Sequence, residues 1–134
     1  MSDSSLLALD VGSRRIGVAV AGLETRLPRP LTTIKVDGHE LEQIERLIKD
    51  HQAKVLVVGL PRNLSGEETA QTQSVKEFAD KLSGLGPELV MQDEALTSHQ
   101  AETELNQRKR RYQKEDVDAL AATYLAEDYL REHS

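Results

Sequence analysis

The sequence predicts an α/β fold in which a mixed sheet of five strands is flanked by helices. Three strand-like segments come first and are joined by short links, which favours an antiparallel meander. Amphipathic helical segments then alternate with short apolar strands, and this alternation is typical of parallel crossovers. With 134 residues, the chain is expected to form a single domain, residues 1–134, that contains its whole functional site.

The first strand-like segment ends in a carboxylate. Leu6 to Leu9 is an apolar run, Asp10 follows it, and Gly12-Ser13 indicates a turn before a second apolar run, Ile16 to Val20. These two runs predict a hairpin with an acid at its mouth. Asp10 has two interpretations. It caps the turn through backbone N–H groups, as aspartates often do, or it belongs to a site whose other members offset the cost of burying its charge.

The next three elements alternate between strand and helix. We expect a third strand over Leu31–Val36, which is rich in β-branched residues. A helix is predicted over Gly38–His51, opened by a capping box of Asp37 and Glu40. Lys54–Val58 is almost entirely apolar, as expected for a strand covered on both faces. A strand, a helix and a strand in this order predict a parallel crossover.

The following helix is predicted to open at a capping box of Ser65 and Glu68 and to run to about Leu82. Its later turns are apolar on one face, but the same face carries Gln71 and Thr72 in the first turns. These polar residues indicate that the helix start borders a solvent-filled cleft, unless it is simply exposed.

The last third of the chain contains a strand, two helices and a basic segment. We expect a strand over Glu88–Gln92, a helix over Thr97–Asn106 and a loop over Gln107–Lys114. A final helix is predicted from about Glu115 to Arg131. Its inward face is expected to contain Val117, Leu120, Ala121, Tyr124 and Leu125.

Composition excludes several classes of function. The chain has no cysteine, and its four histidines are scattered, so a Cys-ligated zinc site and a thiolate nucleophile are excluded. A net charge of −6 argues against a protein that coats nucleic acid non-specifically. A base-stacking platform of the kind found in single-strand-binding proteins is also disfavoured, because there are one Phe, three Tyr and no Trp. Without an apolar run long enough for a membrane span, we expect a cytoplasmic protein with no membrane partner.

Acids recur where three predicted elements reach the same part of the fold. Asp10 and the pair Asp93-Glu94 follow strands, and Asp118 borders the inward face of the last helix. The alternative for Asp118 is an acid that interacts with the helix dipole. The carboxyl ends of parallel strands share one sheet edge, so these acids are expected to meet there. Clustered carboxylates need a cation, and oxygen ligands select Mg²⁺ or Mn²⁺. Two such ions about 4 Å apart can activate water and stabilise the leaving oxygen of a phosphodiester.

Four ordered motifs resemble those of the YqgF family, also called RuvX. They cover nearly the whole chain and comprise DVGSRRIGVA at Asp10–Ala19, VGLPRN at Val58–Asn63 with Gly66, DEALTS at Asp93–Ser98, and VDALAA at Val117–Ala122. The resemblance implies an RNase H-like fold with strand order 3-2-1-4-5. It also implies a metal-dependent nuclease that acts on nucleic acid and matures the 5′ end of 16S ribosomal RNA. The family is associated with resolution of Holliday junctions as well.

The resemblance assigns roles to individual residues. Asp10, Glu94 and Asp118 match the catalytic, metal-binding acids, and Asp93 is a further candidate ligand. Ala95 is a departure, because the family usually has an arginine there. Contacts to nucleic acid are therefore expected from other polar residues, namely Arg14, Arg15, Arg62 and Asn63. The basic segment is expected to close over a phosphate backbone through Arg108, Lys109, Arg110 and Arg111.

Two other classes of function are compatible with parts of the sequence. The Asp-x-Gly-Ser turn also occurs in the phosphate loop of actin and sugar kinases, but those proteins need two domains around a nucleotide. A non-catalytic module that binds RNA or a ribosomal partner would not need the three acids. Within the nuclease interpretation, RNA or branched DNA as substrate, endonuclease or exonuclease action, and a monomer or weak dimer all remain open.

Overall fold

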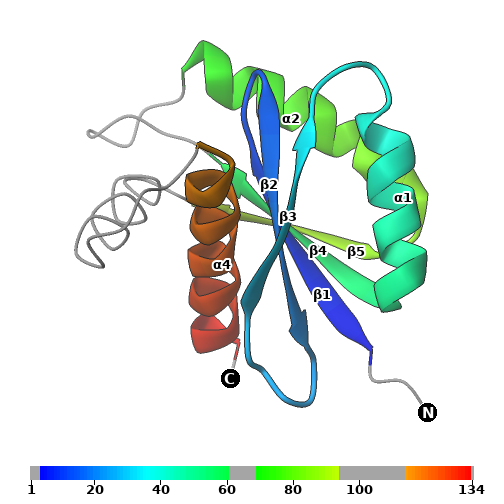
Figure 1. Ribbon diagram of the computed structural model, residues 1–134, viewed down its shortest axis with the longest axis vertical. Helices are drawn as coiled ribbons and strands as arrows, with labels where there is room; N and C mark the ends of the chain where they lie inside the picture. Colours follow the sequence, from blue (N-terminus) through cyan, green and yellow to red (C-terminus); the bar gives the residue numbers. More distant parts are fainter. Residues whose placement is uncertain (1–3, 61–68, 94–113, 134) are drawn as a thin grey trace.

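The computed structural model describes residues 4–60, 69–93 and 114–133, and it places a five-stranded sheet at the centre (Figure 1). The strands lie in the order β3-β2-β1-β4-β5, so the predicted order 3-2-1-4-5 is confirmed. Within the described ranges, no helix is long and apolar enough to cross a membrane. The strands are β1 (Ser5–Val11), β2 (Arg15–Gly22), β3 (Arg29–Lys35), β4 (Ala53–Leu60) and β5 (Glu88–Asp93).

The antiparallel half of the sheet contains the predicted meander. β1 pairs with β2, and β2 pairs with β3 at the sheet edge. β3 begins at Arg29, two residues before the predicted start, and therefore includes Pro30. Proline has no N–H to donate, and it is tolerated here because β3 is an edge strand with an irregular register opposite Val18 and Ala19.

The parallel half is formed by β1, β4 and β5. In this part of the sheet, Leu9 lies opposite Val58, and Val58 lies opposite Met91. The crossovers contain helices α1 (Glu40–His51) and α2 (Ala70–Leu82), followed by a short 3₁₀ turn, η1 (Ser83–Leu85). Because the three strands run in the same direction, their carboxyl ends lie together along one side of the sheet, which we call the carboxyl edge. Asp10 on β1 and Asp93 at the end of β5 both lie at this carboxyl edge.

The two faces of the sheet are covered by different helices. One face packs against α1 and α2, and the other against α4 (Lys114–Glu132) (Figure 1). Alternation along β1 separates the side chains, so Leu7 and Leu9 join the first core and Leu6 and Ala8 the second. All four side chains are completely buried. Burying one Leu side chain stabilises the fold by about 1.5–3 kcal/mol.

α1 begins differently from the prediction. Its N-cap is His39, whose side chain makes no capping hydrogen bond, so the predicted capping box is wrong. Asp37 instead accepts a hydrogen bond from the backbone N–H of His39, at 3.0 Å, and Glu40 accepts one from that of Gly38, at 2.7 Å. Gly38 has a φ of 98°, which turns the chain after β3 and moves the helix start beyond the predicted box.

α2 begins at Ala70, later than the predicted start at Ser65, and residues 61–68 lie outside the described part of the chain. Its capping box is formed by Thr69 and Thr72, which bond each other's backbone N–H groups. Thr72 is fully buried, so the prediction that it borders a solvent-filled cleft is wrong. Gln71 does line a hollow, which is described below.

α4 is more extensively buried than the predicted stripe. Val117, Ala121 and Leu125 are buried as expected, whereas Leu120 and Tyr124 are only partly buried. Small residues widen the buried surface of the helix, namely Ala119, Ala122, Thr123 and Ala126. The predicted helix over 97–106 and residues 107–113 of the predicted loop lie outside the described residues. Lys114, which was predicted to end this loop, is instead the first residue of α4.

Candidate functional site

Asp10 lies next to the carboxyl end of β1, at the edge where the parallel strands end. Asp10 is partly buried, and in the sheet it lies opposite Gly17 of β2. Leu6 and Ala8 belong to the core under α4, and alternation places Asp10 on this same face. The fold therefore presents this carboxylate on the face that carries the last helix.

Asp118 is brought to the sheet from the far end of the chain. It lies near the start of α4, and its Oδ2 accepts a hydrogen bond from Arg15 Nε at 2.7 Å. The Arg15 side chain is 27% exposed, and the Asp118 side chain is 21% exposed. A charge-assisted hydrogen bond in a partly buried position is stronger than an exposed ion pair, and it fixes the orientation of the carboxylate.

Gly17 allows α4 to approach β2 closely. A Cβ atom on this residue would lie 2.0 Å from the carbonyl oxygen of Asp118 and 2.8 Å from the backbone nitrogen of Ala119. No other residue type fits at this distance from helix backbone. Gly17 thus determines where Asp118 lies. In the sequence, the signal for this close approach is a glycine inside an otherwise apolar strand.

The turn between β1 and β2 is held by backbone hydrogen bonds. Gly12 N–H donates to the carbonyl oxygen of Arg15, and Val36 N–H donates to that of Arg14, both at 2.9 Å. A Cβ on Gly12 would lie 2.8 Å from the Arg15 oxygen, so glycine is needed for this closure. The two adjacent arginines at this turn therefore have different surroundings. Arg15 forms an ion pair with Asp118, whereas Arg14 is exposed to solvent.

The C-terminal end of α4 is anchored by the loop between β2 and β3. Arg26 has a φ of 56°, and its guanidinium donates a hydrogen bond to the carbonyl oxygen of Leu130. A cation at a helix C-terminus is favourable for the helix dipole. Together with the close contact at Gly17, this bond fixes α4 on the sheet at both ends.

The other predicted site residues divide into two groups. Asp93 ends β5, where it lies opposite Leu60 in the register. The remainder lie outside the described residues: Glu94, Arg62, Asn63, Arg108, Lys109, Arg110 and Arg111. Among residues 4–60, 69–93 and 114–133, no three acidic or histidine side chains gather to form a metal site. The described part of the chain therefore contributes Asp10 and Asp118 to the candidate site, with Arg15 bound to Asp118.

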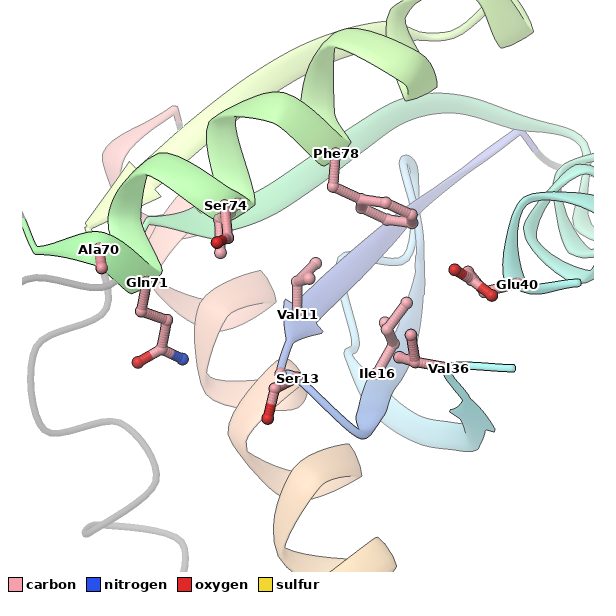
Figure 2. Close-up of a pocket in the computed structure, with 11 residues that line it drawn as sticks. Val11, Ser13, Ile16, Val36, Glu40, Ala70, Gln71, Ser74 and Phe78 are labelled. Atoms are coloured by element: carbon pink, nitrogen blue, oxygen red, sulfur yellow. The ribbon is translucent and has the colours of Figure 1, made fainter. Parts of the chain in front are cut away.

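A hollow of about 450 Å³ lies on the opposite face of the sheet, between the hairpin turn and α2 (Figure 2). Val11 and Ile16 contribute to it from the sheet, and Gln71, Ser74 and Phe78 contribute from α2. The polar start of α2 had predicted a cleft there, and Gln71 does line this hollow, but the contributions of the hairpin turn and of Phe78 were not predicted. The formation of the hollow depends on the packing of two helices, which periodicity does not specify.

Proteins with similar sequences match this chain over nearly its whole length. The family model RuvX, described as "Holliday junction resolvase", matches residues 4–132. A protein of Chloroflexus aurantiacus named "Putative pre-16S rRNA nuclease" is 42% identical over 97% of this chain and 88% of its own length. A protein of the same name from Lactococcus lactis is 34% identical over 96% and 95% of the two chains.

Solved structures with a similar fold include two resolvases. RuvC of T. thermophilus in complex with a Holliday junction substrate has a TM-score of 0.60 and 16% identity, over 98% of this chain and 97% of that chain. The Fowlpox virus resolvase with its junction DNA has a TM-score of 0.55 and 10% identity, over 96% and 98%. At these identities the similarity concerns the fold, and it confirms the predicted RNase H-like architecture. On the family match and the curated relatives, which bear the names of nucleases, this chain belongs to the RuvX family.

Proposed function

We propose that this protein is a metal-dependent nuclease that hydrolyses phosphodiester bonds at the 5′ end of precursor 16S ribosomal RNA. The observation that carries the proposal is the placement of Asp118 at the sheet, on the face to which Asp10 belongs. The names of the curated relatives support this choice of substrate. This substrate would place the protein in the cytoplasm, and we expect it to act as a monomer or weak dimer.

The candidate donors fit a hard divalent cation. The chain has no cysteine, and Asp10, Asp118, Glu94 and Asp93 offer only carboxylate oxygens. We propose that Asp10, Glu94 and Asp118 hold Mg²⁺ or Mn²⁺, with Asp93 as a further ligand. When bound, such ions polarise the scissile phosphate and activate the attacking water.

The residues of the chain would prepare this site in distinct ways. Arg15 orients the Asp118 carboxylate by donating to Oδ2, which leaves the second carboxylate oxygen available to a metal. Arg14 is exposed beside the turn and would contact a phosphate of the bound strand. We propose further phosphate contacts from Arg62, Asn63 and the basic segment Arg108–Arg111, which would compensate for Ala95.

Two adjacent arginines allow the roles of positioning and phosphate binding to be separated. We expect Arg15→Gln to weaken Mn²⁺ binding and lower kcat by about 10–100-fold, because Asp118 loses the group that orients it. Arg14→Gln should instead raise KM and reduce the slope of log affinity against log salt by up to about 0.7–0.9, with metal binding unchanged. Calorimetric metal titration, steady-state kinetics and thermal unfolding of both variants provide the measurement. Identical profiles for the two variants would contradict the assigned roles.

The substrate is tested by comparing cleavage of three nucleic acids by the purified protein. We expect Mn²⁺- or Mg²⁺-dependent cleavage of a precursor 16S fragment that contains the mature 5′ end, and slower cleavage of a linear duplex. A four-way DNA junction is the third substrate, because the family description and the structurally similar resolvases favour junction resolution as a second function. Preferential cleavage of the junction would overturn the rRNA assignment. Binding of the fragment without cleavage would instead support a non-catalytic module.

A further inference from the structure

The hollow beside the hairpin has the size and lining of a ligand pocket. Its volume of about 450 Å³ falls within the range of about 300–1,000 Å³ that small-molecule sites occupy. It is formed by residues of the turn, the sheet, α1 and α2 (Figure 2). Apolar side chains come from Val11, Ile16, Val36, Val75 and Phe78.

Polar groups interrupt this apolar lining at several points. Ser13 contributes a hydroxyl from the turn, Gln71 and Ser74 contribute an amide and a hydroxyl from α2, and Glu40 contributes a carboxylate from α1. Figure 2 shows Glu40 and the Phe78 ring on the same side of the pocket. The negative charge of Glu40 disfavours a phosphate. Its Oε1 already accepts from the backbone N–H of Gly38, and the carboxylate can accept further hydrogen bonds from the amino or imino groups of a neutral ring.

The pocket lies next to the proposed catalytic edge. Val11 lines it, and Val11 directly follows Asp10 in β1. Because side chains alternate, Asp10 belongs to the α4 face while Val11 belongs to the α1 and α2 face. Only the strand end and the Gly12-Ser13 turn separate the two sites. A polynucleotide bound at Asp10 would therefore come within reach of the pocket if it crossed this end of the sheet.

We infer that the pocket receives one unpaired nucleobase of the substrate. This inference rests on the proposed nuclease function and adds a preference for strands that contain an unstacked nucleotide near the cleaved bond. Nucleic acid-binding proteins recognise such bases by stacking on an aromatic ring and by hydrogen bonds to the base edge. Phe78 supplies the ring, and Ser13, Gln71, Ser74 and Glu40 supply the donors and acceptors. Arg14 directly follows Ser13 and is exposed, so we expect its guanidinium to contact the phosphate of the same nucleotide.

Two leucine substitutions on α2 provide a matched test. Ser74 lines the pocket and Gln73 does not, and both residues are exposed. Ser74→Leu should fill part of the pocket, while Gln73→Leu adds the same side chain outside it. Each is combined with Asp10→Asn, so that binding is measured without cleavage. The probes are an RNA duplex with one unpaired 2-aminopurine and the same duplex without the unpaired base.

We expect Ser74→Leu to bind the bulged duplex about tenfold more weakly than Gln73→Leu, which lies within the range for losing one stacked base. The change in 2-aminopurine fluorescence on binding should also be lost in Ser74→Leu only. The perfect duplex should bind both variants equally. Equal binding of the bulged duplex would overturn the inference, as would an equal loss for both duplexes, which would indicate a general contact surface. Because no cleavage is measured, these outcomes are independent of whether the protein is an active nuclease.

Discussion

Replacement of Asp118 by asparagine is expected to reduce cleavage of the precursor fragment by roughly 10³-fold or more. When several residues act as one catalytic unit, removing any one of them removes most of the activity. Asp10→Asn should have the same effect, and the double variant should be little worse than either single one. Both substitutions preserve side-chain size, so the fold is expected to persist. Single-turnover rates at saturating metal provide the measurement.

The matched control is Asp128→Asn on the same helix. Asp128 pairs with Arg131 at 2.7 Å, and its side chain is 39% exposed, so its removal should leave cleavage unchanged. Thermal unfolding of all variants separates loss of chemistry from loss of structure. A folded Asp118→Asn protein with near-normal rates would show that this acid is not catalytic.

Replacement of Gly17 by alanine is expected to destabilise the protein by about 3 kcal/mol, the upper end of the usual cost of overpacking. The new Cβ would lie 2.0 Å from the carbonyl oxygen of Asp118, and a helix backbone cannot relax as a flexible side chain can. α4 must therefore move away from β2, which should break the bond between Arg15 and Asp118. Unfolding in urea measures the change in the free energy of unfolding, and the rate of cleavage should fall as well.

Gly84→Ala provides the control for this substitution. A Cβ on Gly84 would meet no heavy atom within 4 Å, so this variant should unfold within about 0.5 kcal/mol of the parent protein. If Gly17→Ala were as stable and active as Gly84→Ala, the close approach of α4 to β2 would not determine the position of Asp118.

Local pattern was sufficient to predict most of the sheet. Apolar runs and turn residues located all five strands to within a few residues, and they placed Asp10 at a strand end. The order of the strands came from the resemblance to a family, since pairing across the sheet is not encoded in local periodicity. Asp118 was singled out for a simple reason: it is an acid beside the apolar stripe of a helix.

Features that depend on contacts between distant segments were not predictable in the same way. The start of α1 moved because Gly38 adopts a positive φ, and Thr72 is buried because it completes a capping box with Thr69. The prediction that Arg15 binds nucleic acid did not include its hydrogen bond to Asp118, an acid 103 residues away in the chain. No local signal specifies such a pair.

The central claim is that Asp10 and Asp118 belong to one metal site, and titration of Mn²⁺ by calorimetry tests it most directly. The parent protein, Asp10→Asn, Asp118→Asn and the double variant are compared at equal ionic strength. If the two acids share ligation, each single substitution should weaken binding at least tenfold, and the double variant should show clear non-additivity. Strictly additive losses, or Mn²⁺ binding that is unchanged in either single variant, would contradict a shared site.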